Sequence, residues 1–208
     1  MSETVAEYGR AGRTVAALIA LLALAGIVLY AQAQIGRGST LPETLWVLVR
    51  YFTILSNVLV LVVFALIALG AHVTPRFVAG TALAIVLVGV VFELLLTGLS
   101  DNLSAGSAIA NTLLHRVTPL VVPFFWLLFV PKGRLHMTDT LLWAAFPVAY
   151  LVYAMIRGSA EGLYAYPFLD IGANGVMQVT IIVAVIAVGF LLSGIALVGI
   201  DRWLATRR

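Results

Sequence analysis

The chain has 208 residues, of which 62% are hydrophobic and only 10% charged, and its mean hydropathy of +1.11 is far above that of an ordinary soluble domain. It contains no cysteine, which excludes disulfides, thiolate nucleophiles and thiolate metal sites. The net charge of +3 comes from basic residues at the ends of apolar runs, so it does not indicate a nucleic-acid partner.

Six apolar runs follow one another along the chain, each close to the ~20 residues that a helix needs to cross ~30 Å of hydrocarbon. They cover Thr14 to Gln34, Trp46 to Leu69, Phe77 to Leu99, Ile109 to Val130, Thr140 to Ile156 and Asn174 to Ile200. The runs are continuously apolar rather than alternating, which argues against the strands of a β-barrel. We therefore predict an all-α fold, in which residues 1–208 form a single domain, an integral membrane bundle of six transmembrane helices.

Lysine and arginine are distributed unevenly between the two ends of these runs. One side collects Arg10, Arg13, Arg76, Lys132, Arg134, Arg202, Arg207 and Arg208. The other side has Arg37 and Arg157, together with Arg50 if that residue reaches the surface. Because cytoplasmic loops carry an excess of basic residues, the N- and C-termini are predicted to be cytoplasmic.

Polar side chains of five predicted helices fall at one depth on the opposite, outer side. They are Arg50, Thr53 and Asn57 of the second helix, Glu93 of the third, Asn111, His115 and Thr118 of the fourth, Tyr150 and Tyr153 of the fifth, and Asn174 and Gln178 of the sixth. At ~1.5 Å per residue, Thr53 and His115 lie ~10 Å and ~9 Å along their helices. One polar pocket that opens outward would satisfy all of these groups.

His115 is the strongest indication of a functional site, because an ionisable side chain inside a membrane needs a partner. Pro119 has no amide hydrogen, so the carbonyl of His115 should lose its helical partner and the helix should kink there. His72 and His136 fall in loops, so paired histidine ligands for a membrane haem are absent. We therefore expect no metal and no cofactor.

The chemistry that Thr53 and His115 permit is nucleophilic acyl transfer. A threonine hydroxyl needs a base within hydrogen-bond reach, and a neutral imidazole suits that role. The hydroxyl oxygen would attack an ester carbonyl and form an acyl-threonine that water then releases. Asn57 or Asn111 are candidate donors to the developing oxyanion. A pocket reached laterally from the outer leaflet would select acyl chains by burying them.

Structural roles are alternatives for the same polar residues. The Thr53 hydroxyl could instead donate a hydrogen bond to the carbonyl of Val49 in its own helix. Asn57 and Asn111 are equally well explained as hydrogen-bonding contacts between helices.

The charged residues allow a second function that is not enzymatic. Glu93 and Arg50 are expected to form a structural ion pair, since a lone charge is costly at that depth. Alternatively, an outward-facing polar pocket would hold a small ligand in a binding or transport protein, in which Arg50, Glu93 and Asp170 matter more than Thr53.

Three segments resemble the bacterial six-helix branch of the androgen-induced membrane protein family. They are RYFTILSN (Arg50 to Asn57), HRVTPLVVPFFWLLFVPKGRL (His115 to Leu135) and YPFLD (Tyr166 to Asp170). Animal members of this family are threonine hydrolases of fatty acid esters of hydroxy fatty acids. The resemblance implies a multi-pass protein of the bacterial inner membrane that acts on a lipid or another small molecule with an acyl chain.

The resemblance also bears on the residues of the site. The family's nucleophilic threonine follows an aromatic-containing Tyr-x-Thr stretch, which matches Tyr51 to Thr53, and its histidine precedes a proline-bearing helical segment, which matches His115 and Pro119. Ser56 and Asn57 depart from the family pattern. The fold and the Thr53/His115 pair therefore carry over better than the substrate does.

Overall fold

The computed structural model describes residues 8–99 and 105–207, and the regular elements of these ranges are all helical. The α-helices are α1 (Arg10–Gly36), α2 (Leu41–Leu48), α3 (Phe52–Ala68), α4 (Pro75–Val91), α5 (Ala105–Thr112), α6 (Thr118–Phe129), α7 (Met137–Glu161) and α8 (Ile171–Ala205). Two π-helical turns, η1 (Phe92–Leu96) and η3 (Leu113–Val117), and two 3₁₀ turns, η2 (Thr97–Leu99) and η4 (Pro167–Leu169), complete them. The predicted all-helical class is confirmed for the described residues.

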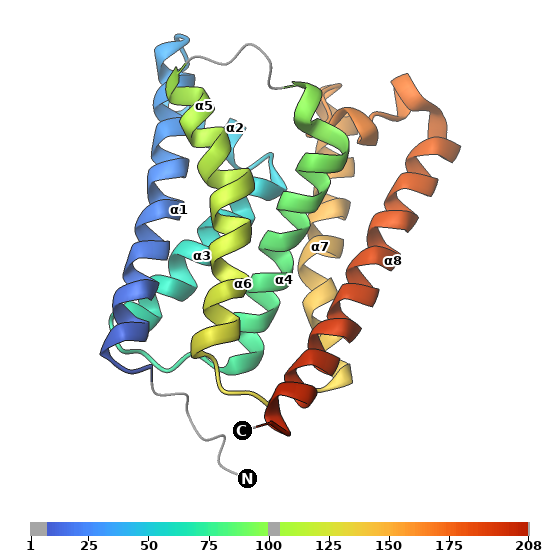
Figure 1. Cartoon of the computed structure of the whole chain (residues 1–208). Coiled ribbons are helices and arrows are strands. Elements are labelled where there is room, and N and C mark those ends of the chain that lie inside the picture. The colour runs from blue at the N-terminus through green and yellow to red at the C-terminus, as the bar shows by residue number, and fades with distance from the viewer. Residues whose placement is uncertain (1–7, 100–104, 208) are drawn as a thin grey trace.

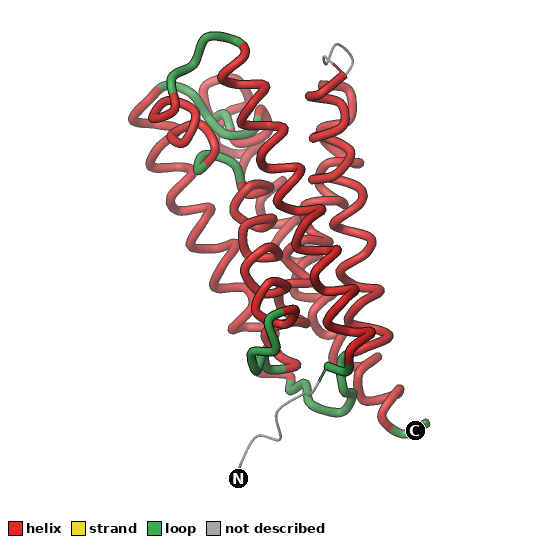
Figure 2. The backbone as a smooth tube through the Cα atoms, turned by 90° about the vertical axis from the view of Figure 1, so that its left-hand side faces the viewer, coloured by secondary structure: helices red, strands yellow, loops and turns green. Residues whose placement is uncertain are grey.

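The long helices run side by side, and the connections between them gather at the two ends of the bundle (Figures 1 and 2). Five helical segments are long and apolar enough to cross a membrane: Arg10–Gly36, Pro75–Leu96, Gly106–Phe129, Met137–Glu161 and Ile171–Ala205. A bent pair, α2 with α3, makes a sixth if the two helices are taken together. The beginning of α1 and the end of α8 lie at the same end of the bundle (Figure 1).

The second predicted span is not one continuous helix. Helices α2 and α3 meet at an angle of 92°, and Tyr51 between them has an extended backbone. The prediction that Arg50, Thr53 and Asn57 lie on one continuous second helix is therefore wrong, because Arg50 precedes the break. Backbone groups freed at such a break must find partners within the bundle, and here the Tyr150 hydroxyl donates to the carbonyl of Arg50 over 2.8 Å.

Helix α4 packs against both α3 and α6, and α3 also packs extensively against α1. Gly89 of α4 faces Pro119 of α6, and a Cβ atom added at Gly89 would lie 2.8 Å from the Cβ of Pro119 and 3.4 Å from the carbonyl oxygen of His115. Small residues allow such close contact between membrane helices. The glycine therefore lets α4 reach the segment that contains His115.

Candidate functional site

Thr53 and His115 are in contact. Thr53 occupies the first turn of α3, and His115 lies in the π-helical turn η3 between α5 and α6. The hydroxyl oxygen Oγ1 of Thr53 is 3.2 Å from Nε2 of His115, and Thr53 is 6% exposed. The structure thus brings together the two residues that the sequence indicated as nucleophile and base.

The second ring nitrogen fixes the tautomer of His115. Nδ1 lies 3.1 Å from the backbone carbonyl oxygen of Asn111. A carbonyl oxygen can only accept a hydrogen bond, so Nδ1 must carry the proton that is donated to it. In the neutral imidazole Nε2 then has a lone pair, and it faces the Thr53 hydroxyl. This is the arrangement that a general base requires.

The π-helical turn explains how the chain presents His115 and also frees a carbonyl beside it. The amide of Thr118 donates to Leu113, five residues earlier, instead of to Leu114. Pro119 has no amide to donate, as the sequence indicated. The carbonyl of Leu114 is consequently available to a side chain of another helix. The expected irregularity near Pro119 therefore takes the form of a widened turn just before it.

Asn57 binds this freed carbonyl and joins α3 to α6. Its Nδ2 donates to the Leu114 carbonyl over 3.2 Å and to the Thr53 carbonyl over 2.8 Å, while its Oδ1 accepts from the Thr118 hydroxyl over 2.8 Å. Asn57 and Thr118 are both completely buried. Both amide hydrogens of Asn57 are thus engaged, which leaves none for an oxyanion, and the alternative of a contact between helices describes its role here.

Tyr166 is a third polar group at Thr53 that the sequence argument did not select. Its hydroxyl accepts the backbone amide of Thr53 over 3.3 Å and lies 3.5 Å from Oγ1 of the same residue. Burial raises the pKa of the Tyr166 phenol, so the group remains protonated and able to donate. Its signal in the sequence was the segment YPFLD, which carried only the family resemblance.

The ring of His115 is held from the other side by Phe92 in η1. The two rings stack with centroids 4.2 Å apart. The guanidinium of Arg116 lies 5.4 Å from the centre of the same phenyl ring and pairs with Glu93 over 2.6 Å. The expected ion pair between Glu93 and Arg50 is therefore wrong, because Glu93 binds the residue next to His115.

Arg50 instead belongs to a cluster that ties the α2–α3 break to the end of α7. It pairs with Glu161 at 2.5 Å, and Glu161 also accepts from Arg157 over 2.8 Å and from the Trp46 indole over 3.0 Å. The Tyr153 hydroxyl accepts from Arg157 over 2.7 Å. Arg50 and Tyr153 thus belong to this cluster, and none of its side-chain hydrogen bonds or ion pairs reaches Thr53 or His115.

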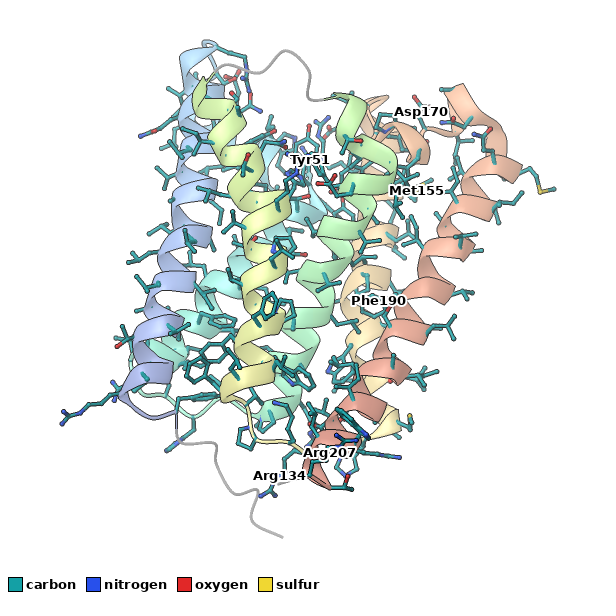
Figure 3. The ribbon with its side chains drawn as sticks, viewed as in Figure 1. Tyr51, Arg134, Met155, Asp170, Phe190 and Arg207 are labelled. Carbon is teal, nitrogen blue, oxygen red and sulfur yellow. The ribbon has the colours of Figure 1, made fainter. Side chains whose placement is uncertain are left out.

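The remaining predicted site residues have other places. The side-chain amide of Asn174 donates to the carbonyls of Pro167 and Asp170, over 2.7 and 2.9 Å, at the start of α8. Gln178 is exposed on α8. Asn111 contributes its backbone carbonyl to His115. Nitrogen and oxygen atoms gather around Tyr51 in the upper part of the bundle, whereas carbon predominates at mid-height below them (Figure 3).

A cavity of about 180 Å³ is lined in part by Thr53. Apart from Thr53 and the tyrosines 150 and 166, its lining is apolar: Phe52, Leu87, Val88, Val91, Leu96, Ala144, Pro147, Val148, Leu151, Phe168, Leu169, Val183, Ile186, Ala187, Phe190 and Leu191. The polar pocket expected here is thus replaced by an apolar one. Within the described ranges, no three His, Asp or Glu side chains are grouped so as to hold a metal ion.

Comparison of the chain with protein-family models, with curated proteins and with solved structures finds no match in any of the three.

Proposed function

We propose that the protein is an intramembrane hydrolase of lipid-like esters, with Thr53 as the nucleophile and His115 as its base. The observation that carries this proposal is the contact of the Thr53 hydroxyl with an imidazole nitrogen 3.2 Å away, in a residue that also lines an apolar cavity. A nucleophile that touches its base and borders a substrate-sized space has the arrangement that acyl transfer needs.

The reaction would proceed in two halves. In the first, Nε2 of His115 takes the Thr53 proton while Oγ1 attacks the ester carbonyl carbon, and the protonated imidazole then gives this proton to the departing alcohol. In the second half, His115 takes a proton from water, the resulting hydroxide attacks the acyl-threonine, and the acid leaves as Oγ1 recovers its proton. The Asn111 carbonyl would hold the ring in the required tautomer throughout.

Tyr166 and the backbone of Thr53 are the donors closest to the reacting oxygen. The amide of Thr53 is in the first turn of α3, where a helix has no internal partner for it and the helix dipole favours negative charge. At present this amide bonds the Tyr166 hydroxyl. A carbonyl oxygen placed between the two would accept from both and would be stabilised as it becomes an oxyanion.

The cavity favours an acyl chain as the substrate's largest part, because its lining offers almost no polar partner to another kind of group. With both termini in the cytoplasm, as the distribution of basic residues predicts, Thr53 would lie in the outer half of a bacterial inner membrane. The family resemblance suggests fatty acid esters of hydroxy fatty acids or related lipids. The two-residue chemistry needs no cofactor.

No observation favours the alternative of a binding or transport protein. The charged groups on which it depends already have partners among the described residues: Arg50 pairs with Glu161, and Glu93 pairs with Arg116. The carboxylate of Asp170 accepts the backbone amide of Ala173 and caps α8. None of the three lines the cavity beside Thr53.

A fluorophosphonate probe, which reacts with activated hydroxyl nucleophiles, tests the proposal. The purified protein in lipid nanodiscs should be labelled, and peptide mass spectrometry should place the adduct on Thr53. Thr53→Ala and His115→Ala should abolish labelling, whereas Thr112→Ala should not, since that exposed hydroxyl bonds only the Ala108 carbonyl of its own helix. A folded wild-type protein that the probe does not label would overturn the proposal.

A further inference from the structure

A second hollow lies between α4 and α8, next to the cavity at Thr53. Its volume is about 360 Å³. On α4 and η1 it is lined by Leu83, Val86, Leu87, Val90, Val91, Leu94 and Leu95, and on α8 by Ile181, Ile182, Val185, Ile186, Gly189, Phe190 and Ser193. We call it the α4–α8 groove.

The groove adjoins the cavity at Thr53. Four residues line both spaces: Leu87 and Val91 of α4, and Ile186 and Phe190 of α8. Helix α8 lies at one edge of the bundle (Figure 1) and lines both spaces. The apolar linings of the groove and the cavity are therefore contiguous from the lateral surface of the bundle to Thr53.

The chemistry of this path fits an unbranched hydrocarbon chain. Among the described residues, those that line the groove include no charged side chain and one polar side chain, Ser193, which donates its hydroxyl to the Gly189 carbonyl over 2.8 Å. Val90 and Val185 on its two walls are 49% and 66% exposed, as expected for surfaces that face lipid. A polar headgroup would find no partner along this path, whereas an acyl chain needs none.

Phe190 stands where the two spaces meet. It is 5% exposed. It lies nearer than the polar groups around Tyr51 to the end of the bundle where α1 begins and α8 ends (Figure 3). The cavity wall on α8 runs from Val183 to Leu191, which corresponds to ~12 Å along the helix axis at ~1.5 Å per residue. A longer chain extends beyond this wall, and Phe190 is one of the side chains at which it can continue from the cavity into the groove.

We propose that the α4–α8 groove is the lateral entrance through which the acyl chain of a membrane lipid ester reaches Thr53, and that Phe190 limits the chain length accepted by the inner cavity. This inference rests on the proposed hydrolase function. It assigns the entry route and the length limit to particular residues, and each can fail while the Thr53/His115 chemistry stands.

Two glycines of α8 provide a matched pair of variants. A Cβ atom added at Gly189 or at Gly199 meets no atom within 4 Å, so a larger side chain fits at either position without displacing a neighbour. Gly189 lines the groove and Gly199 does not. Gly189→Phe should therefore obstruct the entrance, while Gly199→Phe adds the same side chain to the same helix elsewhere.

The first measurement is kcat/KM for p-nitrophenyl esters of increasing chain length, with the proteins in nanodiscs. Gly189→Phe should lower kcat/KM for long-chain esters on the order of tenfold or more, and should lower it much less for the acetate ester, which has no long chain to pass through the groove. Gly199→Phe should match wild type throughout, and Phe190→Ala should shift the preferred length upward. A wild-type length profile in Gly189→Phe, with hydrolysis intact, would refute the entrance.

The second measurement does not depend on hydrolysis. The methyl ester of a palmitate that carries a diazirine in its chain is photo-crosslinked to wild type and both glycine variants, and the adducts are mapped by mass spectrometry. Adducts on the cavity residues Val183 and Ala187 should form in wild type and Gly199→Phe and be lost in Gly189→Phe. If they are absent from wild type or persist in Gly189→Phe, the inference is wrong whether or not the protein hydrolyses esters.

Discussion

Removal of the Tyr166 hydroxyl tests the proposed oxyanion site most directly. Tyr166→Phe keeps the ring, which stacks on Phe168 with centroids 5.2 Å apart and meets Tyr51 edge-on at 6.1 Å. It removes the oxygen that is 3.3 Å from the Thr53 amide and 3.5 Å from Oγ1. Packing should therefore survive while one donor to the oxyanion is lost.

The size of the effect follows from what the hydroxyl contacts. Loss of one oxyanion donor typically lowers kcat about 10²- to 10³-fold, and the 3.5 Å separation from Oγ1 places Tyr166 at the lower end, ~10²-fold. KM should change little, because the hydroxyl acts on charge that develops only in the transition state. The Thr53 amide also loses its acceptor, which should cost about 1–3 kcal/mol of unfolding free energy.

Steady-state hydrolysis of a p-nitrophenyl ester gives kcat and KM separately, and thermal unfolding gives the stability. Tyr164→Phe is the matched control. Tyr164 lies in the same connection between α7 and η4, but its hydroxyl, unlike that of Tyr166, does not bond Thr53. The oxyanion role of Tyr166 is refuted if Tyr166→Phe retains the wild-type kcat in a folded protein, or if the loss appears in KM alone.

Three further substitutions test how the site is held together. Asn57→Leu should lower the unfolding free energy by about 1–3 kcal/mol, because the buried carbonyls of Thr53 and Leu114 lose their donor. Fluorophosphonate labelling should slow in parallel, and unchanged stability would contradict the hydrogen bonds assigned to Asn57. Gly89→Val should cost about 1–3 kcal/mol through forced separation of α4 from α6, with Gly199→Val as the uncrowded control; equal melting temperatures for the two would refute the close contact. Arg50→Gln should lower the unfolding free energy by roughly 1–3 kcal/mol because its ion pair is nine-tenths buried on the arginine side, whereas Arg116→Gln breaks an exposed pair and should cost less; the reverse order would contradict the assigned positions.

Hydropathy predicted the helices because lipid-spanning segments need length and apolar character, which are local properties of the chain. The depth count for Thr53 assumed a straight second helix, so it does not hold across the break at Tyr51, although Thr53 and His115 are in contact as expected. The sequence did not predict the break at Tyr51, because the partners of the residues at the break come from distant segments. Arg50 pairs with Glu161, 111 positions away, and its carbonyl accepts from Tyr150, 100 positions away.

Side-chain roles were harder to predict than positions. Asn57 was proposed as an oxyanion donor from its residue type and depth, but the π-helical turn at His115 frees the Leu114 carbonyl that takes one of its hydrogens. That turn depends on how α5 and α6 pack, which periodicity does not reveal. Tyr166 was missed because it precedes a 3₁₀ turn outside the apolar runs, where depth gives no guide.

The bend between α2 and α3 has a consequence for the order in which the site can be assembled. Thr53 and His115 both belong to the first four predicted spans. The groups that hold the first turn of α3 in place come later in the chain: Glu161, which pairs with Arg50, and the Tyr166 phenol, which bonds the Thr53 amide. A nascent chain that ends at Val130 contains the Thr53 hydroxyl and the His115 imidazole but lacks Glu161 and Tyr166. Hydrolytic competence would then arise only when the last third of the polypeptide is in place, so a nascent chain would be inert toward the lipids that surround it.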